Sequence, residues 1–201
     1  DPERGLDGLY SASLFEFSPA ALDFLPLAIE LGRSFVHPRY WGSRSLDYLW
    51  QGIGAYLRRH PGVRYLFGPV SLSASLPEAA REWIVLAHSH YFGDREALAR
   101  ARNPFTVPDS VQRQAAALWQ GMGAAAGLSL LKGKLAEEGS TIPTLYRQYV
   151  DLCEPEGVRF LAFGVDPGFG HCVDGLIRLD LERLKPAKRQ RYLAAPTQRA
   201  A

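Results

Sequence analysis

An acid and a base stand close together in the apolar segment 27–36, which runs into a turn that contains Pro38 and Gly42. Glu30 could accept a proton from an amine, and Arg33 could orient that carboxylate or fix a carboxylate of a substrate. A helical pattern starts directly after the turn, and backbone N–H groups at such a place can hold a phosphate or a thioester carbonyl. The alternative is an ordinary ion pair on the surface of a strand.

The turn from His37 to Ser45 offers groups that can bind a phosphate-bearing substrate such as a pantetheine arm. Its N–H groups lie at the positive end of a helix dipole, and Arg39 and Arg44 can pair with phosphate oxygens. A plain connection between a strand and a helix explains the same residues without a ligand. In the turn and the strand before it, we assign binding of substrate or thioester donor to Ser34, Val36, His37, Arg39, Gly42, Ser43 and Arg44.

The strand predicted over residues 27–36 must position the acid and the base. Alternation places Leu31 and Arg33 on one face of this strand and Glu30 on the other. Gly32 inside the strand indicates a β-bulge. Such a bulge changes the face to which Arg33 points and can bring it beside Glu30.

A helix and a second strand follow the turn. Ser43 is a good N-cap, apolar residues recur after it at helical spacing, and Pro61-Gly62 ends the pattern. Residues 63–72 predict the second strand, which Pro69 confines to an edge or to a region where strands splay apart. Ser71, in the same strand, is a further binding candidate.

The rest of the chain predicts more helices and a hairpin. The expected elements are a helix from the capping box Ser75-x-x-Glu78 to Tyr91, a loop with some helix over 94–108, a long helix over 110–138, a helix over 141–153, and strands over 158–165 and 173–181. This order predicts an α/β (α+β) fold, in which helices pack on a mixed sheet.

The hairpin loop between the last two strands carries Asp166, His171 and, just after it, Asp174. An aspartate and a histidine can form an acid–base unit, so we assign substrate binding to Asp166 and His171. The alternative is structural, because an aspartate ahead of Pro-Gly commonly caps a turn.

Three other patterns resemble nucleotide-binding or metal-binding motifs but lack the spacing or secondary structure that those motifs need. Gly121-x-Gly123 lies inside a helical pattern, whereas a dinucleotide fingerprint needs a strand, a turn and a helix. The stretch from Gly127 to Gly133-Lys134 has five residues between its glycines rather than the four of a P-loop, and no Ser or Thr follows. His88-x-His90 lies in a helix, where such side chains diverge, so we expect no metal site.

The bulk composition limits the function classes. The 201 residues carry a formal net charge of +2, which argues against a nucleic-acid binder driven by its overall field. Between residues 178 and 199, seven lysines and arginines stand against two acids, which suits a solvated surface, an acidic partner protein or anionic lipid head groups.

Two cysteines, Cys153 and Cys172, suggest free thiols rather than a disulfide framework. We see no signal peptide or membrane span, and the start at Asp1 leads us to expect a fragment or processed chain.

Several segments together resemble a known family. Glu30-Leu31-Gly32-Arg33-Ser34-Phe35-Val36-His37-Pro38, with Leu49-Trp50-Gln51-Gly52-Ile53 and Tyr65-Leu66-Phe67-Gly68-Pro69-Val70-Ser71, resembles the ornithine N-acyltransferases that make lyso-ornithine lipid in bacteria, also called hemolysin-like. These GNAT-like enzymes of lipid biosynthesis use acyl–acyl carrier protein. Pro143-Thr144-Leu145-Tyr146, Cys153-Glu154-Pro155 and the run from Val165 to Leu176 are similar to the same group. Glu30-x-x-Arg33 is also similar to acyl-homoserine-lactone synthases, which are GNAT relatives.

The resemblance, which covers roughly residues 8–193, implies a GNAT-like mixed sheet flanked by helices. We expect one domain over 1–201, with an irregular lead-in over 1–26 and a basic tail over 182–201; the first strands and helices of the fold would precede residue 1. The resemblance places pantetheine near residues 36–45. The usual acyl-carrier loop reads Gln/Arg-x-x-Gly-x-Gly/Ala, whereas this chain has Arg39-Tyr40-Trp41-Gly42-Ser43-Arg44, with arginine in the last place.

The implied activity is transfer of a fatty acyl group from an acyl carrier protein or coenzyme A thioester to the amine of an amino acid such as ornithine. Glu30 would accept the proton or hold the amine, and Arg33 would orient it. The co-substrate is acyl-carrier phosphopantetheine or acyl-CoA, with no tightly bound cofactor, no metal and no nucleic acid. We expect a cytoplasmic protein that contacts the carrier protein through Arg39, Arg44, Arg58 and Arg59, and a membrane surface peripherally. The alternatives are a non-catalytic module that binds acyl groups or carrier protein, and a signal synthase of the lactone type.

Overall fold

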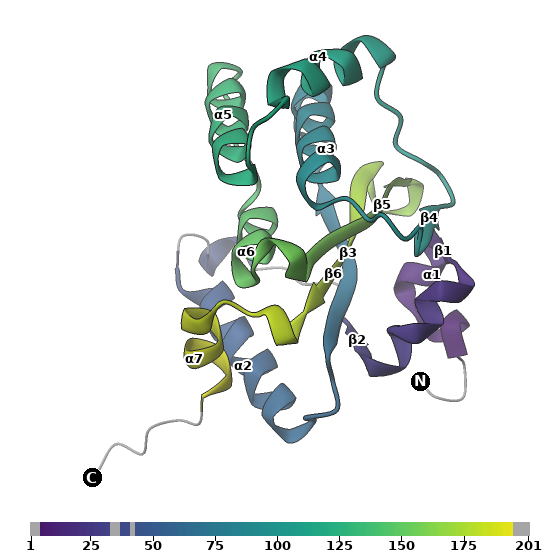
Figure 1. The fold of residues 1–201 in the computed structure, drawn as a ribbon, viewed down its shortest axis with the longest axis vertical. Helices are drawn as coiled ribbons and strands as arrows, with labels where there is room; N and C mark the ends of the chain where they lie inside the picture. The colour runs from purple at the N-terminus through teal and green to yellow at the C-terminus, as the bar shows by residue number, and fades with distance from the viewer. Residues whose placement is uncertain (1–4, 33–36, 41–42, 195–201) are drawn as a thin grey trace.

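A mixed sheet with the strand order β2-β3-β6-β5 forms the centre of the fold (Figure 1). The computed structural model describes residues 5–32, 37–40 and 43–194. β2 (Ala28–Glu30) runs parallel to β3 (Tyr65–Leu72), which pairs antiparallel with β6 (Cys172–Asp180). β6 in turn pairs with β5 (Val158–Asp166) as a hairpin with an irregularity between Phe160 and Ala162. The α/β class expected from the sequence is confirmed.

Alternating side chains of β3 serve two separate hydrophobic clusters. Leu66, Val70 and Leu72 are buried in the larger cluster, together with residues of the helices. Phe67 points to the other face, where it joins a smaller cluster with Phe15 and Phe24. Both faces of the sheet are therefore covered, which is what an apolar strand without strict polar alternation requires.

The N-terminal segment covers the face of the smaller cluster. It contains α1 (Tyr10–Leu14), β1 (Phe15–Phe17) and the 3₁₀ helices Pro19–Asp23 and Leu25–Leu27. β1 pairs antiparallel with β4 (Ala99–Ala101) in a separate two-stranded sheet. The lead-in expected to be irregular thus consists of short regular elements, which buried side chains of Phe15, Ala21 and Phe24 hold against the central sheet.

The helices gather in two groups around the sheet (Figure 1). α3, α4 and α5 lie together at one end, and α2 and α7 lie side by side at the other. The helix expected over 110–138 is divided in two, because Gly121 adopts a φ of +73° and breaks the pattern. The helices are α2 (Ser45–Arg59), α3 (Glu78–Phe92), α4 (Asp109–Trp119), α5 (Ala124–Glu137), α6 (Thr144–Leu152) and α7 (Pro186–Leu193). Among the described residues, no helix combines the length and apolar character needed to cross a bilayer.

The expected capping box before α3 does not form. Helix α3 begins at Glu78, and Pro77 occupies the N-cap position without a side-chain cap. Ser75 therefore stands two residues upstream of the N-cap position, too far to bind the first helical N–H groups, and its hydroxyl instead lies 2.8 Å from that of Ser73.

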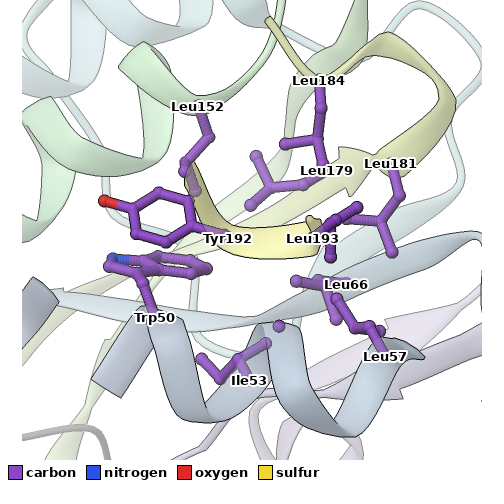
Figure 2. A pocket seen from close by; sticks show the side chains of 11 residues that line it. Trp50, Ile53, Leu57, Leu66, Leu152, Leu179, Leu181, Leu184, Tyr192 and Leu193 are labelled. Atoms are coloured by element: carbon purple, nitrogen blue, oxygen red, sulfur yellow. The ribbon is translucent and has the colours of Figure 1, made fainter. Parts of the chain in front are cut away.

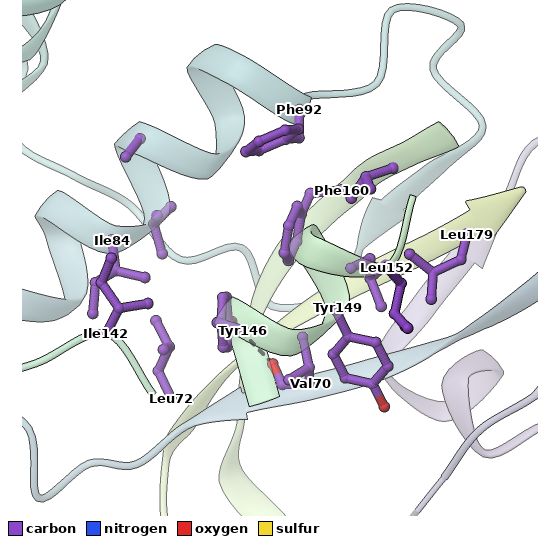
Figure 3. Close-up of a cluster of buried hydrophobic side chains, with 14 of the residues drawn as sticks. Val70, Leu72, Ile84, Phe92, Ile142, Tyr146, Tyr149, Leu152, Phe160 and Leu179 are labelled. Carbon is purple, nitrogen blue, oxygen red and sulfur yellow. Dashed lines mark hydrogen bonds between the residues drawn. The ribbon is translucent and has the colours of Figure 1, made fainter. Parts of the chain in front are cut away.

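Aromatic side chains fill the space between α3, α6 and the sheet (Figure 3). The rings of Tyr146 and Phe160 stack with centroids 5.6 Å apart, and the Tyr146 hydroxyl donates to the carbonyl of Val70 at 3.0 Å. His88 is fully enclosed beside them, with Nδ1 2.7 Å from the carbonyl oxygen of Ile84. Burial lowers the pKa of His88 to about 4, so this imidazole is a neutral part of the core.

The basic tail expected over 182–201 contains a docked helix in its described part. Helix α7 packs on α2, and a Cβ added to Gly54 would lie 2.0 Å from the carbonyl oxygen of Tyr192. The carboxylate of Asp47 accepts from Arg191 at 2.8 Å and from the Tyr192 hydroxyl at 3.2 Å. Of the basic side chains in this segment, Arg191 therefore binds a carboxylate of α2 rather than being wholly solvated.

Candidate active site

The parallel strands β2 and β3 part at Leu31. They pair over three positions, from Ala28 with Tyr65 to Glu30 with Phe67, and the N–H of Leu31 then donates to the carbonyl of Phe67 at 2.6 Å. β3 continues to Leu72, paired with β6. Of the strand expected over 27–36, the structure thus shows β2 only to Glu30, and residues 33–36 lie outside the described part.

Gly68 makes the last close contact between the two strands possible. It has a φ of +150°, and a Cβ built on it would lie only 2.1 Å from the carbonyl oxygen of Leu31. The next residue, Pro69, has no N–H and pairs with β6 beyond the point where the β2 ladder ends. This location agrees with the splayed region that the sequence offered as one place for Pro69.

Apolar hollows lie below the point where the strands part. The first is too narrow to hold a water molecule and is lined by Leu31, Gly68 and Tyr149 among others. A second, of about 20 Å³ and so with room for about one water molecule, lies between α2 and α7, where Trp50 and Tyr192 face each other (Figure 2). Both hollows share Leu66 and Leu179 as lining residues, so apolar side chains continue from the parting strands to α7.

Glu30 is half-buried and binds the start of α1. Its Oε2 accepts the N–H of Tyr10 at 2.9 Å, and its Oε1 accepts the N–H of Ser11 at 2.6 Å. The residue before the helix, Leu9, supplies no side-chain cap. Glu30 therefore caps α1 from the neighbouring strand, and a carboxylate at a helix N-terminus is electrostatically favourable there.

Tyr10 links this carboxylate to the far hairpin. Its hydroxyl donates to Oδ2 of Asp166 at 3.0 Å. Oδ1 of Asp166 accepts the N–H groups of Gly168 at 2.8 Å and Phe169 at 3.1 Å, so the expected turn cap is confirmed. His171 is exposed, at a φ of +57° in the same loop.

A second polar pair joins β3 and β6. Ser71 stands opposite Asp174 in the ladder, and its hydroxyl donates to Oδ1 of Asp174 at 2.5 Å. Ser71 is exposed, whereas Asp174 is only 2% exposed. Burial raises the pKa of Asp174, and the nearby charge of Asp166 adds to this effect, while the hydrogen bond from Ser71 opposes it.

These polar groups share one face of the sheet. Glu30 pairs in register with Phe67, which belongs to the cluster under the N-terminal segment. Ser71 lies an even number of positions farther along β3, and Asp174 lies two positions from Leu176 of the same cluster. Four residues of strand place Ser71 roughly 13 Å beyond Phe67 along β3.

The described part of the turn after β2 is polar and exposed. His37 Nδ1 accepts the N–H of Arg39 at 3.2 Å. The Ser43 hydroxyl donates to the carbonyl of Tyr40 at 2.6 Å and accepts the N–H of Ser45 at 3.2 Å. Ser43 thus contacts the first helical residue, although α2 itself begins at Ser45 with Arg44, not Ser43, at the N-cap position.

Arg44 is not an isolated cation. Its guanidinium contacts the carboxylate of Asp47 at 3.2 Å and lies 5.8 Å from the ring centroid of Tyr48. Arg39 stays exposed, with its guanidinium 5.9 Å from the ring centroid of Tyr40. The other site residues expected from the sequence, Arg33, Ser34, Val36 and Gly42, lie outside the described residues.

Comparison with known proteins points to one group. Residues 1–51 match the acetyltransferase (GNAT) domain. The chain is 28% identical over 199 residues to a glycine N(alpha)-acyltransferase of Phocaeicola vulgatus, an alignment that covers 95% of this chain and 60% of the relative. The chain resembles GNAT-type amino-acid N-acyltransferases. The resemblance found in the sequence is thereby confirmed.

Further relatives carry related names. A glycine N(alpha)-acyltransferase of Bacteroides thetaiotaomicron is 29% identical over 95% of this chain and 58% of its own length. An L-ornithine N(alpha)-acyltransferase of Brucella abortus is 40% identical over 73 residues, which are 36% of this chain and 26% of the relative. The chain therefore spans about three fifths of the length of the glycine acyltransferases that it matches. No solved structure matches it.

Sequence reasoning missed two contributors to the site. Tyr10 belongs to a segment without clear periodicity, so nothing in the sequence placed its hydroxyl near Asp166. Gly68 was quoted only as part of a motif, although a glycine followed by proline inside a strand is itself a sign of a close backbone approach.

Proposed function

We propose that this chain belongs to an N-acyltransferase that moves a fatty acyl group from a thioester to the amine of an amino acid. The observation that carries this proposal is the parting of β2 and β3 at Leu31 and Gly68, with Glu30 directly before it. Parting strands leave main-chain N–H groups free to bind a thioester carbonyl and its developing oxyanion. The similarity to enzymes named glycine and ornithine acyltransferases supports the amino acid as acceptor.

The donor in this proposal is acyl carrier protein or coenzyme A, whose pantetheine arm would lie along residues 36–45. The described part of that stretch supports this, because His37, Arg39 and Ser43 are exposed and polar. Exposed Arg58 and Arg59 at the end of α2 add positive charge that an acidic carrier protein would meet. The fatty tail would lie toward the apolar side chains that line both hollows, Leu66 and Leu179 among them, and these side chains would have to move apart to admit it.

The acceptor amine in this proposal approaches Glu30, with Arg33 as the orienting partner. Each carboxylate oxygen can accept more than one hydrogen bond, so the N–H groups of Tyr10 and Ser11 leave capacity for an amine. Ornithine and glycine are the two acceptors to compare. An N-acylated amino acid with a fatty chain is amphiphilic, so we place the reaction in the cytoplasm at a membrane surface, where basic residues of α7 can meet anionic head groups.

Product mass tests the proposal directly. The purified protein is incubated with fatty acyl–acyl carrier protein or acyl-CoA and with glycine or ornithine, and N-acyl amino acid is measured by mass spectrometry. We expect transfer by the parent protein and a loss of at least about 100-fold in Glu30→Ala. Glu156→Ala, which changes an exposed glutamate far from the site in sequence, is the matched control.

Because Glu30 also caps α1, a second variant separates chemistry from folding. Glu30→Gln keeps an acceptor oxygen for the helix but cannot take a proton. Parent-like transfer by both Glu30 variants would remove Glu30 from the reaction. Donor binding without any transfer by the parent protein would favour the non-catalytic binding module instead.

A further inference from the structure

The Ser71–Asp174 pair stands on the part of β3 that β2 leaves. Within the described residues, β3 pairs with β2 only as far as Phe67, so Ser71 lies beyond the parallel ladder and is exposed. Asp174 lies directly opposite it on the neighbouring strand β6 and is 2% exposed. The Ser71 hydroxyl is therefore positioned between a buried carboxylate and the surface.

We propose that Asp174, acting through the Ser71 hydroxyl, takes up the second proton of the acyl transfer. Glu30 accepts the proton that the ammonium group loses before the attack, and the Ser71–Asp174 pair accepts the proton that the nitrogen loses after it has bonded to the thioester carbon. This inference rests on the proposed function and adds a proton path to it. In this proposal the Ser71 hydroxyl contacts the amine. Asp174 positions that hydroxyl and accepts the proton from it.

The surroundings of Asp174 favour a carboxyl group that can take a proton. None of the lysine, arginine and histidine residues in the described part forms an ion pair with it. Among the described residues, the titratable groups that interact with it are Asp166 from the hairpin, whose charge raises the pKa of Asp174, and the buried phenol of Tyr146 from α6. Burial without a cationic partner makes the ionised form of a carboxyl group costly, and protonation relieves that cost.

Asp166 does not compete for the same role. Its two oxygens bind the turn N–H groups and the hydroxyl of Tyr10, so it is fixed by donors on both sides. Asp174 instead has the Ser71 hydroxyl, a group that can donate one proton while it receives another. Of these two carboxylates on the same sheet face, Asp174 has the partner that a relay needs.

Acyl transfer through the Ser71–Asp174 pair forms one bond at the carbonyl carbon and breaks another. The neutral amine nitrogen forms a bond to the thioester carbonyl carbon, and its surplus proton passes to Ser71 Oγ as the Ser71 proton passes to Asp174. The carbon–sulfur bond breaks, and the sulfur leaves as a thiolate. The proton held by Asp174 returns through Ser71 to the thiolate, so that amide and thiol are released and the pair is restored.

A structural role is the alternative, because a hydrogen bond between paired residues of β3 and β6 also fastens the two strands. Asp174→Asn is the variant that separates the two roles, since asparagine keeps an acceptor oxygen and nearly the same shape but cannot take up the proton. Ser71→Ala removes the relay hydroxyl, and Ser71→Thr restores it. Ser73→Ala is the matched control, because Ser73 is also an exposed serine just after β3.

The test measures kcat and KM for the amine between pH 5 and pH 9 in the parent protein and these four variants, with folding checked by circular dichroism. We expect Asp174→Asn and Ser71→Ala to lower kcat by about 100-fold or more, with KM for the amine changed less than threefold. Ser71→Thr should recover at least a tenth of the parent kcat, and Ser73→Ala should equal the parent.

Two results would overturn the relay. One is parent-like kcat in folded Asp174→Asn, and the other is a rise in KM with kcat unchanged, which would indicate binding instead. Either result leaves the proposed acyl transfer intact, because the parent protein still forms product. If the parent forms no N-acyl amino acid from any donor, the proposed function fails, and the relay fails with it.

Discussion

Gly68 on β3 faces the carbonyl oxygen of Leu31 at the point where β2 leaves the sheet, and a Cβ on Gly68 would lie 2.1 Å from that oxygen. Any side chain here must move main-chain atoms of one strand or the other. The parting of the strands therefore depends on a glycine that the sequence places directly before Pro69.

Gly68→Ala should destabilise the protein and impair acyl transfer together. The clash and the φ of +150° are both unfavourable for alanine, and we expect a cost of about 1–3 kcal/mol in the free energy of unfolding. Urea denaturation measures it. Gly52→Ala is the matched control: Gly52 lies within α2 with open space around a Cβ, so alanine should stabilise by about 0.5–1 kcal/mol. Equal stability of the two variants would contradict the close approach.

Loss of the Glu30 carboxylate should loosen the start of α1. Its two acceptor contacts replace the missing cap at Leu9, and removal of a cap costs about 1 kcal/mol. Hydrogen exchange of the Tyr10 and Ser11 amides should be faster in Glu30→Ala than in the parent, and unchanged in Glu156→Ala. Unaltered exchange in Glu30→Ala would show that the cap is not formed in solution.

Asp47 should stabilise the docking of α7 at neutral pH but not in acid. The hydrogen bond from Arg191 is the main reason that the pKa of Asp47 falls to about 2, below its usual 3.8. A lowered folded pKa gives stability that is present above pH 3.8 and is lost as the pH falls toward 2. Asp47→Asn should lower the free energy of unfolding at pH 7 by on the order of 1 kcal/mol, since Arg44 and Arg191 are exposed.

The check for Asp47 is urea denaturation at several pH values. The difference between parent and Asp47→Asn should shrink from pH 4 downward, while Asp23→Asn, at an exposed position, should match the parent throughout. A constant difference at all pH values would indicate lost packing rather than lost charge.

His88 should make the protein less stable below neutral pH. Because its folded pKa is about 4 against an ordinary 6.5, the unfolded chain binds its proton first, and stability falls as the pH drops from 6.5 toward 4. His88→Phe should flatten the stability curve over this interval, and His60→Gln, at an exposed position, should leave it unchanged. The same slope in His88→Phe and parent would assign the pH dependence to other groups.

Local patterns in the sequence predicted the elements but not their long-range contacts. Alternating apolar residues gave β3, β5 and β6 nearly to the residue, and Pro61-Gly62 marked the end of α2. The long helix over 110–138 was wrong because the effect of Gly121 depends on a φ that propensity alone does not fix. The capping box was wrong because Pro77 took the N-cap position.

Contacts between distant segments explain what the sequence left out of the site. Glu30 and Tyr10 are both visible as polar groups, yet only the packing of the N-terminal segment on the sheet brings them together. The Ser71–Asp174 pair depends on strand register, which is set by the whole apolar pattern of β3 and β6. Local patterns in one sequence do not determine which residues of two strands pair.

The position of a bound donor tests the central claim most directly. A crystal structure with a non-hydrolysable acyl-pantetheine analogue should show its carbonyl group between Leu31 and residues 68–72 of β3, within hydrogen-bond distance of a main-chain N–H. Density for the analogue elsewhere on the protein, with β2 and β3 unchanged and nothing bound between them, would contradict the account.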